Sequence, residues 1–70
     1  MAETAMRLLI GKNIRTRRRK SGMSQEKLGE KVSVSYQQIQ KYECGENSIK
    51  SEKLVMFARV FDCSVNELCE

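Results

Sequence analysis

Residues 24–45 read SQEKLGEKVSVSYQQIQKYECG, and this stretch begins with the pattern of a short amphipathic helix. Ser24 is a good N-cap, because its hydroxyl can accept a hydrogen bond from a main-chain N–H of the first turn. Over residues 25–32 that follow, Leu28 and Val32 stand four apart and form one apolar side. The sequence therefore predicts a helix over 25–32 that is buried on one side.

A second helix is predicted almost immediately after the first. Ser35 can cap it, and Gln38, three residues later, would complete an S-x-x-Q capping box. Gly29 lies inside the first helix, where glycine costs about 1 kcal/mol relative to alanine. Such a glycine usually permits the close approach of another element, here the next helix. Two helices joined by so short a turn form a helix-turn-helix.

The second helix of this pair has two different sides. Ile39 and Tyr42 stand three apart and share one side, which we assign to the core. Amide and basic side chains gather on the opposite side, which should face outward. Its members are Gln37, Gln40, Lys41 and Cys44, with Tyr36 beside them.

Three further helices complete the predicted fold. A first helix over residues 5–20 has Met6, Ile10 and Ile14 on one side, and Gly22 is suited to its left-handed C-terminus. A fourth helix, capped by Ser51, has an apolar side that consists of Leu54, Phe57, Ala58 and Phe61. A short last helix over residues 65–69 begins with a capping box that pairs Ser64 with Glu67. The fold class predicted is all-α, a compact five-helix bundle forming one domain over residues 1–70.

Charge and composition narrow the classes of function. The net charge is +4, and residues 1–23 carry seven basic side chains and one acidic side chain, most of them in KNIRTRRRK at 12–20. Such a cluster attracts polyanions, although basic helix faces are often only solvated. Three cysteines without CxxC spacing and without any histidine do not suit a zinc site or a Cys-His nucleophile. We expect no metal, no cofactor, no membrane span and a cytoplasmic protein with reduced cysteines.

The stretch GMSQEKLGEKVSVSYQQIQKYECGENSIKSEKLVMFARVFDCSVNEL resembles the Cro and phage-repressor type of helix-turn-helix, also called the XRE family. The resemblance runs from Ile10 to Leu68 and implies a lambda-repressor-like, sequence-specific DNA-binding domain of bacterial or phage origin. It implies that residues 25–32 cross the DNA backbone and that residues 36–43 lie in the major groove. The implied base-reading positions are Tyr36, Gln37 and Lys41, with Gln40 as a further candidate. Glutamine can pair with adenine and lysine can donate to guanine, so these residue types suit that role.

The resemblance also implies contacts to phosphate and one structural pair. The family's phosphate contacts fall on Gln25 and Ser35, and an ion pair between Arg18 and Glu43 is implied. Further candidates for the DNA backbone are Ser24, Asn47, Lys50 and, on the basic first helix, Arg15 and Arg19. The turn departs from the family pattern, because Ser33 replaces the usual glycine and would cost roughly 1–2 kcal/mol in a left-handed conformation.

The leading functional hypothesis is a transcriptional repressor that binds a pseudo-palindromic operator as a homodimer, without a separate effector domain. We expect the last helix to form the dimer interface through Val65, Leu68 and Cys69, and if Val65 points inward, Leu68 and Cys69 remain on the outside to form it. In the alternative, Leu68 folds back onto the core and the interface lies elsewhere. A different class of function is an antitoxin or phage-encoded adaptor whose main partner is a protein. RNA or membrane-surface binding is weaker, and an enzyme is least supported.

Overall fold

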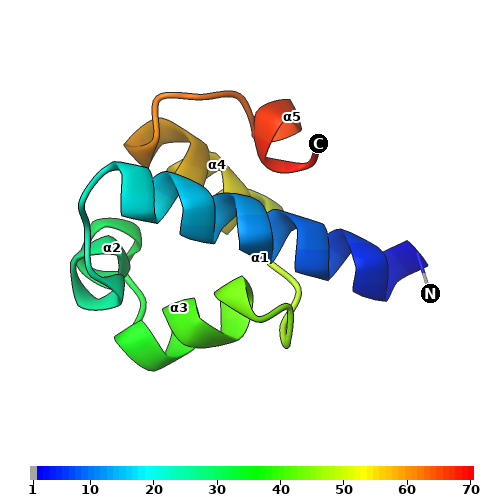
Figure 1. The fold of residues 1–70 in the computed structure, drawn as a ribbon, viewed down its shortest axis with the longest axis horizontal. Coiled ribbons are helices and arrows are strands. Elements are labelled where there is room, and N and C mark those ends of the chain that lie inside the picture. The colour runs from blue at the N-terminus through cyan, green and yellow to red at the C-terminus, as the bar shows by residue number, and fades with distance from the viewer. Residues whose placement is uncertain (1) are drawn as a thin grey trace.

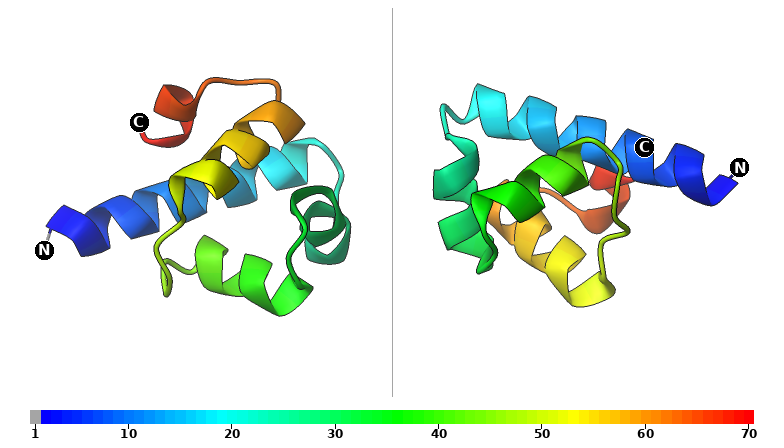
Figure 2. Two further views of the ribbon diagram at one scale, coloured as in Figure 1. Left: turned by 180° about the vertical axis from the view of Figure 1, so that it is seen from behind. Right: turned by 90° about the horizontal axis from the view of Figure 1, so that it is seen from below.

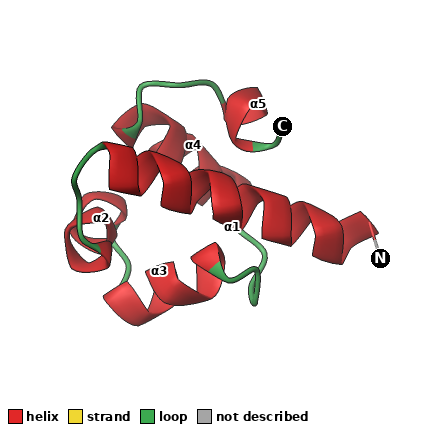
Figure 3. Cartoon of the chain, in the orientation of Figure 1, coloured by secondary structure: helices red, strands yellow, loops and turns green. Residues whose placement is uncertain are grey.

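The computed structural model describes residues 2–70, which form helices and connecting loops (Figures 1 and 3). The five helices are α1 (Ala2–Lys20), α2 (Gln25–Val32), α3 (Tyr36–Glu43), α4 (Ser51–Val60) and α5 (Val65–Leu68). The long helix α1 crosses the molecule, and α3 and α5 lie on opposite sides of it in both face-on views (Figures 1 and 2). The all-α, five-helix prediction is confirmed.

Side chains from every helix meet in one apolar core. Ile14, Leu28, Val32, Ile39, Phe57 and Leu68 are fully buried, and Ile10 and Ala58 are nearly so. Phe57 lies at the centre of an aromatic group, with its ring centroid 5.9 Å from that of Tyr42 at 85° and 6.4 Å from that of Phe61 at 10°. Tyr42 is therefore a half-buried core residue, as its spacing from Ile39 predicts.

Two predicted helix starts need correction. The first helix begins at Ala2 rather than at residue 5. The fourth begins at Ser51, so Ser51 is its first residue and not its cap. Lys50 is the N-cap, with extended φ −65° and ψ 153°, and its carbonyl accepts the N–H of Leu54 at 2.9 Å. The Lys50 side chain makes no capping hydrogen bond. Because the cap position belongs to Lys50, the capping role predicted for Ser51 is wrong.

The placement of Leu68 is the main error of the sequence prediction. Its side chain is fully buried among the core residues, so it does not form an exposed dimer patch. Val65 and Leu68 stand three apart on a helix of four residues, so they share one side of it. That side packs against α1 and α4. Val65 and Cys69 are half-buried and pack against the same core. The alternative, in which Leu68 folds back onto the core, is the one the structure contains.

The segment that carries Leu68 is held onto α1 by polar contacts. The Asn13 side chain donates from Nδ2 to the carbonyl oxygens of Leu68, at 2.8 Å, and Glu70, at 2.9 Å. Arg17 donates from Nη2 to the Glu67 carboxylate at 3.2 Å. At the start of α5, the Ser64 hydroxyl accepts the N–H of Glu67 at 3.1 Å, as predicted. These bonds explain how a helix too short to persist alone keeps its place.

The turn between α2 and α3 keeps the left-handed geometry despite its serine. Ser33 has φ 61° and ψ 43°, and the N–H of Val34 donates to the Gly29 carbonyl at 2.9 Å. The Lys53 ammonium donates to the free carbonyl of Val32 at 2.7 Å, which satisfies another acceptor at this helix end. A Cβ at Gly29 would lie 2.5 Å from the Val34 carbonyl oxygen. The predicted close approach is confirmed, although the neighbour is the turn rather than the body of α3.

Candidate nucleic-acid interface

Helix α3 has one buried and one exposed side, and the exposed side carries the predicted base-reading residues. Ile39 and Glu43 point inward. Tyr36 is 45% exposed, and the outward-facing set is completed by Gln37, Gln40 and Lys41. An amide and a primary ammonium on one convex helix face offer donors and acceptors that can meet the edges of base pairs.

Both helices of the motif begin with a serine cap, as predicted. The Ser24 hydroxyl accepts the N–H of Lys27 at 3.0 Å, and the Ser35 hydroxyl accepts the N–H of Gln38 at 3.2 Å. Both serines are exposed. The remaining main-chain N–H groups of each first turn have no acceptor within the helix, which makes these helix starts suited to an anion such as phosphate.

A buried ion pair fixes the inner side of α3 to α1. Arg18 donates from Nε to Glu43 Oε2 at 2.6 Å and from Nη2 to Oε1 at 3.1 Å, so the pair is bidentate. Arg18 also donates from Nη1 to the Met23 carbonyl at 2.9 Å. The pair implied by the sequence is present, and it leaves Arg18 unable to face DNA.

Gln25 belongs to the same network. Its Nε2 donates to Glu43 Oε1 at 3.1 Å, so the side-chain nitrogen is turned inward rather than toward an external phosphate. The start of α2 therefore joins the end of α3 through one carboxylate. Sequence reasoning predicted a phosphate contact for this residue and did not predict its bond to Glu43.

Comparisons with known proteins agree with this geometry. A family model described as helix-turn-helix matches residues 14–68. An uncharacterized HTH-type transcriptional regulator of Sinorhizobium medicae is 44% identical over 57 residues, which are 81% of this chain and 41% of that protein. The P22 c2 repressor, solved in complex with synthetic operator 9T, is 34% identical with a TM-score of 0.84, covering 89% of this chain and 94% of that chain. The chain belongs to the Cro and phage-repressor type of helix-turn-helix family.

Two further comparisons define the extent of this likeness. The restriction-modification controller protein C.AhdI of Aeromonas hydrophila has the same fold, with a TM-score of 0.87 at 22% identity over 97% of this chain and 99% of that chain. This chain spans less than half the length of the curated relatives it matches. The family match and the relatives together identify a DNA-binding domain of the type found in transcriptional regulators. The family is one of regulators and not of enzymes.

In this helix-turn-helix domain, the loop after α3 is bonded to α3 itself. Gln38 donates from Nε2 to Asn47 Oδ1 at 3.2 Å. The sequence predicts that the Gln38 side chain completes the capping box of Ser35, but the observed bond runs to the loop instead. Asn47 and Lys50, both predicted to contact the DNA backbone, are exposed, with Asn47 inside this loop and Lys50 at its end, before α4.

The basic cluster of α1 divides into internal and external members. Arg17 and Arg18 are used within the domain, by Glu67 and Glu43. Arg15 and Arg19 are exposed and stand four apart, together with exposed Lys12 and Lys20. Gly11, four residues before Arg15, touches the C-terminal end of α3, since a Cβ there would lie 2.3 Å from the Tyr42 carbonyl oxygen. The two arginines therefore continue along the side of α1 that meets α3.

Other chemistry is sparse over residues 2–70. No group of three or more His, Cys, Asp or Glu side chains in this range is arranged to hold a metal ion. The three cysteines are free thiols, and partial burial raises the pKa of the Cys63 thiol, with Arg17 acting in the opposite direction. None of the helices in this range is long and apolar enough to span a membrane.

Proposed function

We propose that this domain is the DNA-binding part of a transcriptional repressor and that α3 enters the major groove of its operator. The observation that carries the proposal is the exposed face of α3, where Tyr36, Gln37, Gln40 and Lys41 lie together while Ile39 and Glu43 anchor the opposite face. The similar P22 c2 repressor is named as a repressor and was solved with an operator, which supports this function for a chain of the same family.

Base recognition is assigned chiefly to Gln37 and Lys41. A glutamine amide can bond to adenine in two places at once, and a lysine ammonium can donate to the two acceptors of guanine. Gln40 lies on the same face and extends the set. The half-exposed ring of Tyr36 can contact a thymine methyl at the edge of the helix.

Contacts to the sugar–phosphate backbone would position α3 in the groove. The capped starts of α2 and α3, at Ser24 and Ser35, offer hydroxyl and main-chain N–H donors to phosphate. The loop after α3 offers Asn47 and Lys50, and α1 offers Arg15 and Arg19. These contacts carry no sequence information but supply most of the affinity and its dependence on salt.

A single domain of this size reads few base pairs, so we propose that two copies bind a pseudo-palindromic operator. In this family of motifs, paired half-sites lie about one helical turn apart, which allows two recognition helices to enter the same side of the duplex. The buried position of Leu68 removes the last helix's leucine from the contact between copies.

Selection of bound duplexes from a random pool tests the proposal. We expect enrichment of a two-fold symmetric sequence, with affinity for that sequence falling at least tenfold in Lys41→Gln. Arg59→Gln removes the same charge from the exposed side of α4 and should leave the enriched sequence and its affinity nearly unchanged. A pool without enrichment would contradict the proposal and favour an adaptor whose partner is a protein.

A further inference from the structure

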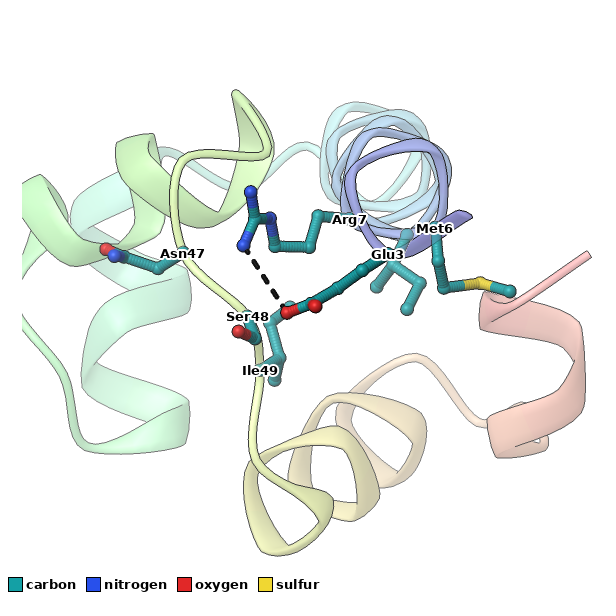
Figure 4. A pocket seen from close by; sticks show the side chains of 7 residues that line it. Glu3, Met6, Arg7, Asn47, Ser48 and Ile49 are labelled. Carbon is teal, nitrogen blue, oxygen red and sulfur yellow. Dashed lines mark ion pairs between the residues drawn. The ribbon is translucent and has the colours of Figure 1, made fainter. Parts of the chain in front are cut away.

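A cavity of about 220 Å³ lies between the N-terminal half of α1 and the loop that follows α3 (Figure 4). Met6, Arg7 and Ile10 of α1 form one wall, and Asn47, Ser48 and Ile49 of the loop form the other. The α1 wall precedes residues 14–68, which match the family model. The cavity is therefore built partly by residues outside the matched helix-turn-helix region.

The polar group that distinguishes this cavity is the Arg7 guanidinium. Its Nε is buried and has no hydrogen-bond partner among the described residues. Nη1 lies 3.7 Å from the Glu3 carboxylate, whose side chain is 79% exposed, and both side chains extend toward the loop (Figure 4). A buried N–H donor without an acceptor is unfavourable, and an exposed ion pair at this distance contributes little. Because Nε is buried while the Arg7 side chain as a whole is 28% exposed, an acceptor in the cavity would bond to the terminal nitrogens of the guanidinium, where Nη1 has only the weak pair with Glu3.

We propose that this cavity binds a small monocarboxylic acid with an aliphatic body. The carboxylate would accept hydrogen bonds from Arg7, the geometry in which a guanidinium and a carboxylate pair most strongly. The aliphatic body would lie against Met6, Ile10 and Ile49. Size agrees with a ligand of about six carbons, because an engineered apolar cavity of roughly 150 Å³ is known to hold benzene.

The charge of Glu3 makes the proposal more specific. A bound carboxylate and the Glu3 carboxylate would compete for the same guanidinium, so Glu3 should weaken binding. Removal of the Glu3 charge should therefore raise the affinity for a carboxylate ligand but not for the corresponding neutral amide. A purely apolar cavity would show neither preference.

Nuclear magnetic resonance titration with hexanoate tests this site without DNA, so its outcome is independent of the proposed function. We expect hexanoate to bind with a Kd near 1 mM or tighter, on the order expected for a ligand of this size, and to shift the methyl signals of Met6, Ile10 and Ile49. Hexanamide, which has the same shape without the charge, should bind at least about tenfold more weakly.

Three variants complete the test. Arg7→Gln should lower the affinity for hexanoate at least about tenfold, and Glu3→Gln should raise it severalfold. Arg59→Gln removes one positive charge, as Arg7→Gln does, and should leave this affinity unchanged. Circular dichroism checks that each variant is folded. If Arg7→Gln does not fold, the Glu3→Gln variant and the amide still decide the matter. Equal binding of acid and amide, an unchanged affinity in Glu3→Gln, or methyl shifts elsewhere in the domain would each overturn the proposal.

Discussion

Replacement of Ser33 by glycine should stabilise this domain, because the turn holds a serine in a left-handed conformation. Ser33 has φ 61° and ψ 43°, and its exposed side chain makes no hydrogen bond within residues 2–70. The left-handed conformation costs a residue with a Cβ roughly 1–2 kcal/mol, and glycine avoids this cost. Glycine also makes the unfolded chain more flexible, which costs about 0.4–1 kcal/mol.

The difference between these terms is a net gain of roughly 0–1.6 kcal/mol in the free energy of unfolding, with a central value of about 0.8 kcal/mol. For a domain of 60–100 residues, each kcal/mol shifts the melting temperature by about 4–8 °C, so the central value corresponds to a rise of roughly 3–6 °C in Ser33→Gly. Thermal and urea unfolding followed by circular dichroism measure both quantities. Val34 and Lys53 keep their bonds to the end of α2 in this variant, so the turn should remain intact.

Two matched variants separate strain from flexibility. Ser21→Gly makes the same chemical change at an exposed turn position where φ is not positive, so it should lose stability through flexibility alone. Ser33→Ala keeps the Cβ and should gain nothing. If Ser33→Gly lowers the melting temperature as Ser21→Gly does, the turn carries no backbone strain and the reasoning is refuted.

Four other changes test the interface and the packing. Gln37→Ala should weaken operator binding by about 1–3 kcal/mol without changing binding to random DNA in a fluorescence titration, and equal losses on both would remove it from the base-reading set. Arg19→Ala should weaken both kinds of DNA alike and lower the salt slope by about one, whereas an unchanged slope would leave it merely solvated. Gly11→Ala should cost about 1–3 kcal/mol in urea unfolding, since the new Cβ would lie 2.3 Å from the Tyr42 carbonyl oxygen, and an unchanged midpoint would contradict that contact. Leu68→Ala should cost about 2–5 kcal/mol as a core truncation, and a dimer lost at full stability in sedimentation would contradict its burial.

Much of the motif could be predicted because its signals are local. Ser24 and Ser35 cap the helices that they precede, and the bounds of α2 and α3 agree with the sequence pattern. The apolar spacing of Leu28 and Val32 is enough to place them in the core. Caps and helical periodicity act within about one turn, so neighbouring residues carry the information.

The errors lie where distant segments decide. The environment of Leu68 depends on whether the chain after α4 returns to α1, and the bonds from Asn13 that hold it there span more than fifty residues. Gly11 shows no local reason for a glycine, because the carbonyl that excludes a side chain belongs to Tyr42. Gln38 likewise finds its acceptor in the loop at Asn47 rather than at its own helix start. In each case the partner is fixed by tertiary packing, which periodicity does not report.

The buried network around Glu43 explains how the two sides of α3 serve different purposes. A buried ion pair is weak evidence of net stabilisation, because desolvation of two charges offsets most of their attraction. The two hydrogen bonds from Arg18 instead fix the orientation of the end of α3 relative to α1. The hydrogen bond from Gln25 fixes the start of α2 to the same carboxylate. Lys41 stands two residues before Glu43 on the exposed side of α3, so its outward direction follows from that geometry. We therefore interpret Glu43 as an orienting residue for the side of α3 that we propose faces DNA, and its loss would change where α3 points even in a variant that remains folded.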